Sequence, residues 1–455
     1  MFQISPDSEK AIKILESHGY EAYLAGGCVR DLAMGKVPHD WDITTAAEPE
    51  ETKRLFRNIG CRVIETGITH GTVTVILGKE LLEITTFRSE AAYSDHRRPD
   101  RVTFVKTARE DVQRRDFTVN GLLYHPAVGI LDYVNGLQDI HAKCLRCIGD
   151  PEERFREDAL RILRGLRFSA VLGFQIETET GDAMTKNRFL LQDISQERKQ
   201  EELNKLLLGK NAKAVLSRYP EIMAAVIPPI GTMVGYDQNN PHHCYDLWTH
   251  TVEAVAAAPE ILSVRLAMLL HDIGKPLCRT TDDNGISHFY DHPRHSAALS
   301  KEILHSLRYS NGIIQTVTTL IEYHNLPLSA TGKSIRRVLN RIGEENLRLL
   351  LAVKKADLAA KSDYRKGEKQ QLLKAAASVL QQVLSERQCF CLNDLAVNGT
   401  DLLAAGVPQG KEIGCLLNLL LEQVIDGQLP NDHSVLLDFA KKQMRTVNSG
   451  KACTD

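Results

Sequence analysis

Two aspartates separated by a single residue have the plainest chemistry in this sequence. Asp40 and Asp42 stand at the start of a short β-prone run, residues 43–45, which predicts a strand. Alternate residues of a strand share a face, so the two carboxylates should lie side by side. Because like charges repel, this arrangement favours a divalent cation between them. We expect Asp40 and Asp42 to bind Mg²⁺ and to be catalytic.

A glycine pair lies shortly before these acids. Gly26 and Gly27 follow a short apolar run and precede residues 32–34, which predicts a strand, a tight turn and the start of a helix. Backbone N–H groups at such a turn bind phosphate, and Arg30 adds a guanidinium that can grip a triphosphate. A glycine pair alone is more often a structural turn. Beside the two aspartates, it favours nucleotide binding by Gly27 and Arg30.

The two features together predict nucleotidyl transfer. A second acidic strand, residues 82–84, offers Glu83 as a third metal ligand. Divalent ions bound by these carboxylates would activate a terminal hydroxyl group and neutralise the charge that develops as pyrophosphate leaves. Such a reaction needs no nucleophilic side chain.

A second set of metal-ligand residues lies in the middle of the chain. His271 and Asp272 are adjacent, His250 precedes them, and Asp357 follows. Imidazole and carboxylate groups can hold a divalent transition metal that activates water. A lone histidine is more often a core residue, but four such ligands favour a metal site. The same segment also contains His292, His295 and His324.

Two kinds of element must position these residues. Between residues 23 and 133, short β-rich runs alternate with polar turns, which predicts a small mixed α/β domain. The expected strands are residues 23–25, 42–44, 72–77, 82–87 and 102–105. From about residue 151 onward the chain should be mostly helical, because apolar residues recur at helical spacing, as in Ala159, Ile162, Leu163, Leu166 and Phe168. Residues 227–241 are the best candidate linker, and charged residues 361–369 mark a second boundary.

Composition places the chain among ordinary soluble globular proteins. Its 455 residues are 43% hydrophobic and 25% charged, and no stretch approaches about 18 uninterrupted apolar residues. The polar start and the ten scattered cysteines favour a cytoplasmic protein with reduced thiols. The net charge of -2 gives no strong overall field to attract a polyanion. Any RNA must therefore be bound by local basic patches.

Four motifs follow one another in the first half of the chain. They are Gly26-Gly27-x-Val29-Arg30-Asp31, Asp40-Trp41-Asp42, Arg114-Arg115-Asp116-Phe117-Thr118-Val119-Asn120 and Glu157-Asp158-Ala159-Leu160-Arg161. Together they resemble the motifs of class II tRNA nucleotidyltransferases, the CCA-adding enzymes and their poly(A) polymerase relatives. The resemblance implies an α+β fold, with a polymerase-β-like nucleotidyltransferase head built on a small mixed sheet and a mostly α-helical remainder. We expect the head at residues 1–150, a helical neck at 151–240, an HD domain at 241–365 and a tRNA-binding tail at 366–455.

The same resemblance implies that the helix beginning at Glu157-Asp158 reads the incoming base. We expect Asp158 and Arg161 at positions i and i+3 of one helical face. Cytosine and adenine each present an exocyclic amine beside a ring nitrogen acceptor, so a carboxylate and a guanidinium suit both. Guanine and uracil would leave both protein groups wrongly paired, at roughly 1 to 3 kcal/mol per group. The resemblance adds four nucleotide-contacting residues, Arg115, Asn120, Arg164 and Arg167.

Three further segments carry resemblances. Residues 87–100 resemble the flexible loop required for the final adenosine, and Ser195-Gln196-Glu197-Arg198 resembles an element that supports the base-reading helix. Residues 245–357 resemble an HD-type phosphohydrolase domain. Such a domain can act on phosphate esters at RNA ends, as in RNA repair, or persist only as a scaffold. If it binds metal, the implied ligands are His250, His271, Asp272 and Asp357.

The expected substrates are CTP, ATP and the 3′ end of tRNA, and no membrane partner is expected. Template-independent CCA addition or repair is the first hypothesis, with A-only addition and poly(A) synthesis as alternatives within the class. A second hypothesis makes the histidine site primary and the head a nucleotide binder. A third makes the chain an RNA-binding module, which the paired Asp40 and Asp42 argue against.

Overall fold

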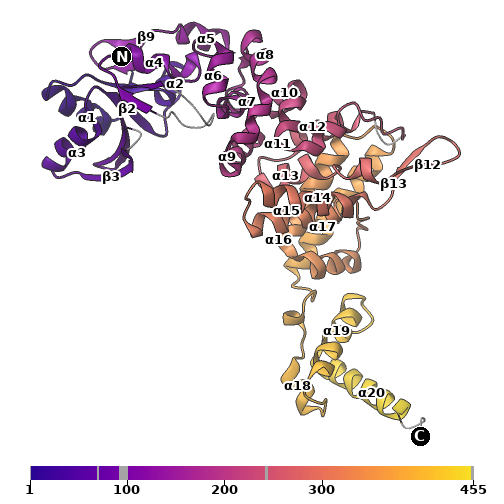
Figure 1. Cartoon of the computed structure of the whole chain (residues 1–455). Coiled ribbons are helices and arrows are strands. Elements are labelled where there is room, and N and C mark those ends of the chain that lie inside the picture. Colours follow the sequence, from indigo (N-terminus) through magenta and orange to yellow (C-terminus); the bar gives the residue numbers. More distant parts are fainter. Residues whose placement is uncertain (1, 69–70, 92–100, 241–243, 452–455) are drawn as a thin grey trace. The chain divides into compact units, whose positions relative to one another are not determined.

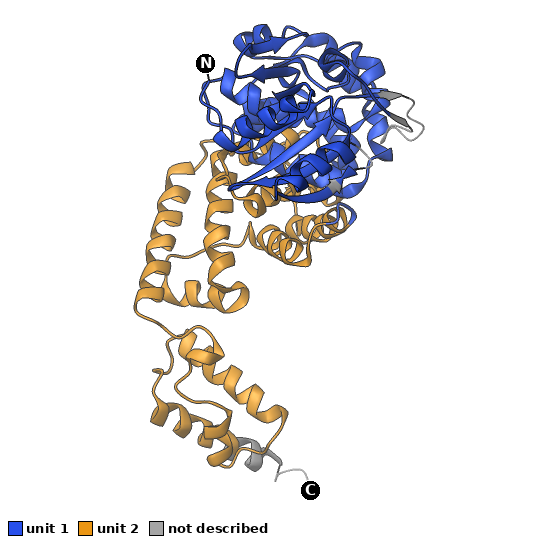
Figure 2. Cartoon of the chain, turned by 90° about the vertical axis from the view of Figure 1, so that its left-hand side faces the viewer, with its two compact units in different colours: residues 1–231, 306–308 blue, residues 232–305, 309–455 orange. Residues whose placement is uncertain are grey.

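The computed structural model describes residues 2–68, 71–91, 101–240 and 244–451. The chain divides into two compact units (Figure 2). Unit 1 comprises Met1–Gly231 and Ser306–Arg308, and unit 2 comprises Thr232–His305 and Tyr309–Asp455. The main division falls within residues 227–241, the proline- and glycine-containing stretch.

A seven-stranded sheet organises the first half of unit 1 (Figure 1). Its strand order is β3-β4-β5-β2-β1-β8-β9. Neighbouring strands run antiparallel except β2 and β5, which are parallel. The strands are β1 (Ala22–Ala25), β2 (Trp41–Thr45), β3 (Arg62–Gly67), β4 (Thr72–Leu77), β5 (Glu80–Thr86), β8 (Leu122–His125) and β9 (Gly129–Asp132).

The parallel pair of β2 and β5 positions the acidic residues. Ile43 and Ile84 are paired in register and almost completely buried, which fixes one face of both strands against the core. The adjacent pair, Asp42 and Glu83, therefore lies on the opposite face. A register slip of one residue would turn both acids into the core, so core packing also specifies the acidic pair.

Helices accompany the sheet in the first part of unit 1, and further helices come after it in the sequence. A two-stranded hairpin of β6 (Arg88–Ala91) and β7 (Arg101–Phe104) accompanies the sheet. The helices of the first part are α1 (Pro6–Ser17), α2 (Gly27–Ala33), α3 (Pro49–Asn58), α4 (Ala108–Gln113) and α5 (Gly136–Ala142). Those of the second part are α6 (Pro151–Glu157), α7 (Leu160–Leu172), α8 (Thr178–Lys186), α9 (Gln196–Leu208), α10 (Ala212–Arg218) and α11 (Pro220–Val226).

The junction of α6 and α7 has clear local causes. Asp150 caps α6 through its carboxylate, and Pro151 occupies the first helical turn, where its missing N–H costs nothing. Helix α7 ends at Gly173, which takes the left-handed conformation with φ at 75°. The apolar side of α7 is buried at Ile162 and Leu166. Its other side is left for charged residues.

Unit 2 is almost entirely helical. Its first part consists of α12 (Leu247–Ala257), α13 (Leu262–Leu270), α14 (His292–Ser306), α15 (Asn311–Tyr323), α16 (Gly332–Ala359) and α17 (Lys366–Ser385), with the small hairpin of β12 (Arg279–Thr281) and β13 (Ser287–Phe289). A separate apolar cluster that includes Leu402, Leu420 and Leu436 joins the last three helices, α18 (Gly399–Ala404), α19 (Lys411–Ile425) and α20 (His433–Lys451).

The mixed α+β head followed by helices confirms the predicted fold class. Within the described part of the chain, no helix has the length and apolar character needed to cross a membrane.

Candidate functional site

A cavity of about 530 Å³ lies in unit 1 between the sheet and α7. Acidic residues of the sheet and guanidinium groups of the loops and α7 meet in it, which is the charge pattern that a metal-bound triphosphate requires. Predicted residues that line it are Gly27, Arg30, Asp42, Arg115, Asn120, Asp158, Arg161 and Arg164. Lining residues that were not assigned as nucleotide ligands include Arg88, Arg114, Asp116, Phe168 and Arg198.

Asp42 is the acid most affected by this environment. Burial, then Glu83 and Asp40, raise its pKa to about 6 against the opposing effect of Arg115. Asp40 is exposed just before β2 and does not line the cavity. Its charge adds to the rise in the pKa of Asp42, but Asp40 precedes β2, so a shared strand face of the two carboxylates stays a prediction. Asp42 and Glu83 line the cavity while Asp40 lies outside it, and a divalent cation bound beside Asp42 would relieve the repulsion among the three acids.

The glycine turn forms another wall. Gly26 has φ at 71° and ψ at −127°, and α2 begins at the next residue, Gly27. A Cβ atom at Gly26 would lie 3.1 Å from Arg115 Nη1. Glycine is therefore needed at this position both for the backbone conformation and for the close approach of Arg115.

A chain of polar contacts holds the arginines of the cavity in place. Arg30 Nη1 donates to Asn120 Oδ1 at 2.7 Å, and Asn120 Nδ2 donates to Asp116 Oδ1 at 3.2 Å. Arg164 Nε then donates to Asp116 Oδ2 at 2.8 Å. This chain joins the glycine turn, the Asp116–Asn120 motif and α7. It orders Arg30 and Arg164 before any nucleotide binds.

Arg115 is fixed by a buried acid. Its Nη2 donates to Asp111 Oδ2 at 3.0 Å, and Arg114 Nε donates to Asp111 Oδ1 at 2.8 Å. Asp111 is fully buried, and these two guanidinium groups hold the pKa of its carboxyl below the usual value against the effect of burial. Asp111 sits in α4, five residues before Asp116, and no motif or periodic spacing singled it out.

Phe168 has a different role from the one its spacing predicted. Its position in the apolar pattern of α7 predicted a core residue, but the ring is only partly buried and lines the cavity. Three guanidinium carbons lie over this ring, at 5.6 Å for Arg30, 5.4 Å for Arg164 and 4.0 Å for Arg167. Arg167 also pairs with Glu202 at 3.0 Å and is not among the lining residues. The ring holds the arginines together despite their like charges.

The expected geometry of Asp158 and Arg161 was wrong. Asp158 does not share a helical face with Arg161, because it lies between two helices, with an extended backbone that ends α6, and α7 begins only at Leu160. Its Oδ1 accepts the N–H of Leu160 at 3.0 Å, and its Oδ2 lies 3.6 Å from Arg198 Nη2. Burial raises the pKa of Asp158, and Arg198 and Arg161 oppose that rise.

Arg161 makes its contacts within the protein. Its Nη1 donates to the carbonyl of Arg154 at 3.0 Å and to Glu157 Oε2 at 2.9 Å, and its Nη2 donates to the carbonyl of Arg114 at 3.0 Å. The guanidinium is buried yet borders the cavity. Arg198, in the Ser195–Arg198 motif at the start of α9, lies beside Asp158, which is consistent with the supporting role expected of this motif.

Part of the predicted loop cannot be compared with the structure. Residues 92–100, which include Tyr93, Asp95, Arg97, Arg98 and Pro99, lie outside the described residues.

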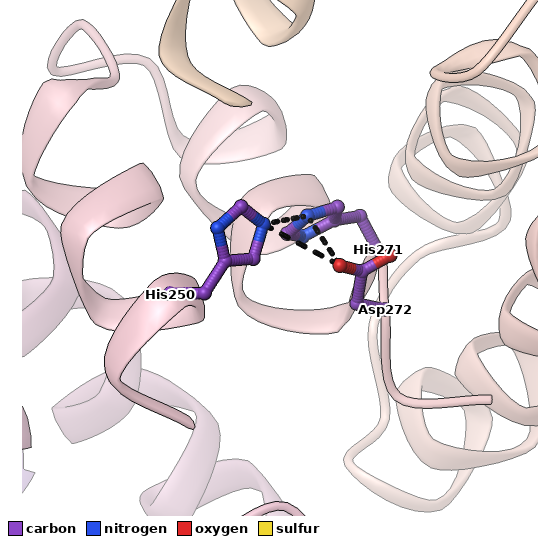
Figure 3. Close-up of side chains that lie close together, drawn as sticks. All are labelled: His250, His271 and Asp272. Carbon is purple, nitrogen blue, oxygen red and sulfur yellow. Dashed lines mark hydrogen bonds and ion pairs between the residues drawn. The ribbon is translucent and has the colours of Figure 1, made fainter. Parts of the chain in front are cut away.

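The four predicted histidine-site residues converge in unit 2. His250 of α12 and His271 at the end of α13 point their Nε2 atoms at each other, 3.3 Å apart, with Asp272 beside them (Figure 3). Asp272 Oδ2 lies 3.4 Å from His250 Nε2 and 3.2 Å from His271 Nε2. Asp357 Oδ1, from α16, lies 3.3 Å from His250 Nε2 and 3.7 Å from His271 Nε2. This is a set of four ligand atoms around one point.

Acidic and basic side chains are paired in this cluster. Burial lowers the pKa of His271, but Asp272 and Asp357 outweigh it and raise the pKa to about 9. Lys275 Nζ lies 2.7 Å from Asp272 Oδ2, and Lys361 Nζ lies 2.5 Å from Asp357 Oδ2. Each carboxylate therefore has one lysine partner and still faces the imidazoles.

Family models match a segment in each half of the chain. The family model described as the poly A polymerase head domain matches residues 22–146. A second model, tRNA nucleotidyltransferase domain 2, matches residues 280–440. The first match contains Gly27, Arg30, Asp40, Asp42 and Asn120.

Relatives match nearly the whole chain. The CCA-adding enzyme of Enterococcus faecalis is 34% identical over 438 residues, covering 96% of each chain. The CCA-adding enzyme of Limosilactobacillus fermentum is 35% identical and covers 95% of each. The crystal structure of the Bacillus stearothermophilus CCA-adding enzyme in complex with CTP matches with a TM-score of 0.72 and 26% identity, over 98% of this chain and 100% of that one. The chain belongs to the class II tRNA nucleotidyltransferases, in the family of CCA-adding enzymes.

Proposed function

We propose that this protein adds C and A nucleotides from CTP and ATP to the 3′ end of tRNA without a nucleic-acid template. The observation that carries the proposal is the cavity of unit 1, where Asp42 and Glu83 face a cluster of arginines in a chain whose full-length relatives are CCA-adding enzymes. The RNA 3′ oxygen forms a bond to the α-phosphorus of the nucleotide. The bond between the α-phosphorus and the oxygen that bridges it to the β-phosphorus breaks, the hydroxyl proton passes to solvent, and pyrophosphate leaves.

The donor set fits Mg²⁺. Asp40 and Asp42 would hold it, with Glu83 as an additional acid, because hard carboxylate oxygens suit this ion. Burial, together with the charges of Glu83 and Asp40, raises the pKa of Asp42, and a bound cation would offset both effects. When bound, the ion supplies charge neutralisation and activates the attacking hydroxyl. Arg30, Arg115 and Arg164 bind the phosphate oxygens, and the glycine turn lets them approach the backbone closely.

The base is read at the junction of α6 and α7. Asp158 accepts the exocyclic amine of cytosine or adenine, and Arg161 donates to the adjacent ring nitrogen. Because the Arg161 donors are held by protein groups, this role requires one of those contacts to be exchanged for the base. Asn120 and Arg167 order the arginines that bind phosphate.

The test uses three tRNA transcripts, ending before the first C, after the first C and after the second C. Each labelled nucleotide is supplied separately with magnesium. Stepwise addition of C, C and A, with GTP and UTP rejected, is the expected result. Extension only of the transcript that ends in two Cs would identify an A-only enzyme. Repeated addition of A to any acceptor would identify a poly(A) polymerase.

A second activity is favoured by the convergence of His250, His271, Asp272 and Asp357. We assign to this set a divalent transition metal, whose chemistry when bound is to lower the pKa of a water molecule. The substrate is a phosphate ester at the end of damaged RNA. Hydrolysis consumes one water, whose oxygen joins phosphorus while one ester bond breaks, and the leaving oxygen takes a proton. This would expose a 3′ hydroxyl for extension.

The cytoplasmic location stays a prediction from the sequence.

A further inference from the structure

The floor of the nucleotide cavity continues past the acidic residues onto the neighbouring strand. Thr85 lies two residues beyond Glu83 on β5, and Thr72 is its partner on β4, so both side chains share the face of Glu83. Their hydroxyl oxygens lie 3.0 Å apart. Both threonines line the cavity, together with Arg88 at the start of β6. The nucleotide contacts proposed above use none of these three residues.

The strand order separates this end of the cavity from the phosphate-binding end. The glycine turn follows β1, and Asp42 lies on the next strand, β2. Glu83 lies beside Asp42 on β5, and β4 comes after β5. Each step from one strand to the next covers about 4.8 Å. The two acids therefore lie between the glycine turn and the pair of Thr72 and Thr85.

Nucleotidyl transfer needs its two reacting oxygens on opposite sides of phosphorus. The attacking and leaving oxygens are roughly in line, so the RNA 3′ oxygen approaches from the side away from the departing pyrophosphate. In the proposed reaction the pyrophosphate lies toward Gly27 and Arg30, and the α-phosphate lies beside the acids. The end of the RNA then lies over β5 and β4, at Thr72 and Thr85.

Arg88 is fixed at this end of the sheet. Its backbone N–H donates to Oδ1 of the buried Asp111 at 3.3 Å. Its side chain extends toward the start of β4, because a Cβ atom at Gly71 would lie 3.9 Å from Arg88 Cδ. The positive charge of Arg88 thus borders the part of the cavity that lies beyond the acids.

An exposed aromatic ring accompanies Arg88. Phe104 of β7 is its partner across the hairpin, so the two side chains lie on the same face. A Cβ atom at Gly71 would lie 3.0 Å from Phe104 Cε1, so the ring lies beside the same glycine. Phe104 is 38% exposed. An aromatic ring for the base and a guanidinium for the phosphate together bind a single-stranded nucleotide.

We propose that the last nucleotide of the RNA acceptor binds at the end of the cavity formed by β4 and β5. Arg88 binds its phosphate, the hydroxyl groups of Thr72 and Thr85 contact its ribose, and its base packs on Phe104. This placement rests on the proposed nucleotidyl transfer, because that reaction sets the side of attack. Arg88 therefore positions the RNA, whereas Arg30 and its neighbours bind the incoming triphosphate.

The contact between Arg88 and phosphate is tested by removing each partner in turn. Acceptor RNAs that lack the CCA end carry either an ordinary phosphate or a neutral methylphosphonate between their last two nucleotides. Arg88→Ala should lower kcat/KM for the ordinary RNA about tenfold at saturating CTP. On the methylphosphonate RNA the variant and the wild type should react equally, because the contact is already lost. A loss of the same size on both RNAs overturns the assignment.

The nucleotide side is measured separately. In the absence of RNA, equilibrium dialysis should give the same dissociation constant for CTP with Arg88→Ala as with the wild type. Weaker CTP binding by a folded variant would place Arg88 on the triphosphate and overturn the proposal. Arg88→Lys keeps the positive charge and should recover most of the lost kcat/KM.

Arg62→Ala is the matched control. Arg62 is an exposed arginine of β3, and its partner Ile76 lies at the other end of β4 from Thr72. This variant should equal the wild type on both RNAs. Circular dichroism shows whether Arg88→Ala is folded. If it is not, Phe104→Ala takes its place and an abasic last nucleotide replaces the methylphosphonate, with the same loss of coupling expected.

The two possible failures give different results. Incorporation by the wild type with equal losses on both RNAs overturns the RNA subsite alone. No incorporation by the wild type overturns the proposed nucleotidyl transfer. The dissociation constants of the two RNAs then decide the subsite, which requires that Arg88→Ala weaken binding of the ordinary RNA only.

Discussion

Gly26 stands at the edge of the nucleotide cavity with a φ of 71°. Gly26→Ala should lower the free energy of unfolding by about 1 to 3 kcal/mol, because an L-residue is strained there. It should also weaken CTP binding, since the new methyl group lies 3.1 Å from Arg115 Nη1 and displaces it. Urea unfolding and calorimetric titration measure the two effects.

Gly35→Ala is the control for strain alone. Gly35 has the same φ of 71°, but an added Cβ meets no atom within 4 Å. This variant should lose stability and keep CTP affinity. Equal losses of CTP affinity in both variants would contradict the role given to Arg115.

Phe168 supports a second prediction at the same scale. Phe168→Ala should weaken CTP and ATP binding about tenfold, because the ring that holds Arg30, Arg164 and Arg167 together is lost. Val171→Ala, at an exposed position of the same helix, should leave binding unchanged. Equilibrium dialysis with each nucleotide measures the difference. Unchanged affinity in the phenylalanine variant would show that the polar contacts alone order the arginines.

Between elements, the ion pair of Asp116 and Arg164 joins the segment before β8 to α7 and should make stability depend on pH. Burial would raise the pKa of Asp116, but Arg164 and Asn120 outweigh it and hold the pKa at about 2, below the ordinary 3.8. A depressed folded-state pKa means that the ionised carboxylate stabilises the fold. The contribution, about 2 kcal/mol, is present above pH 4 and disappears as the pH falls from about 4 to about 2.

Urea unfolding of the wild type and Asp116→Asn across this pH range checks the sign. The wild type should be the more stable protein at pH 5, and the difference should shrink steadily toward pH 2. A difference that is constant with pH would mean that shape, not charge, makes Asp116 important.

Periodicity and turn residues predicted several elements well. The expected strand at residues 72–77 coincides with β4, and that at 42–44 lies inside β2. Strands β3, β6, β8 and β9 were not predicted. Length alone does not explain this, because β3 has six residues whereas the four-residue strands β1 and β7 were predicted.

Spacing was less informative about how helices begin. Asp158 and Arg161 are three residues apart, yet a break between α6 and α7 separates them, because Asp158 satisfies the N–H of Leu160 instead of continuing the helix. The apolar spacing of α7 does not show whether Phe168 is a core residue or a ring against which arginines pack. His292 and His324 are 32 residues apart in the sequence and come together only in the folded chain.

Across the whole molecule, the nucleotide cavity and the histidine cluster lie in separate compact units. His271→Ala with Asp272→Ala should therefore abolish phosphate-ester hydrolysis while nucleotide addition to an intact tRNA transcript stays within about twofold of the wild type. Both activities are assayed on the same preparation. Loss of nucleotide addition together with hydrolysis would indicate that the cluster is structural.

The catalytic role of Asp40 and Asp42 is measured by single-turnover incorporation of CTP on a tRNA transcript that lacks its CCA end. Asp40→Ala with Asp42→Ala should reduce the rate by about a thousandfold or more, while circular dichroism shows an intact fold. Glu50→Ala, an exposed acid of α3, is the control and should react at the wild-type rate. A higher magnesium concentration should not restore the rate of the double variant. Incorporation at near the wild-type rate would show that these carboxylates are not needed for nucleotidyl transfer.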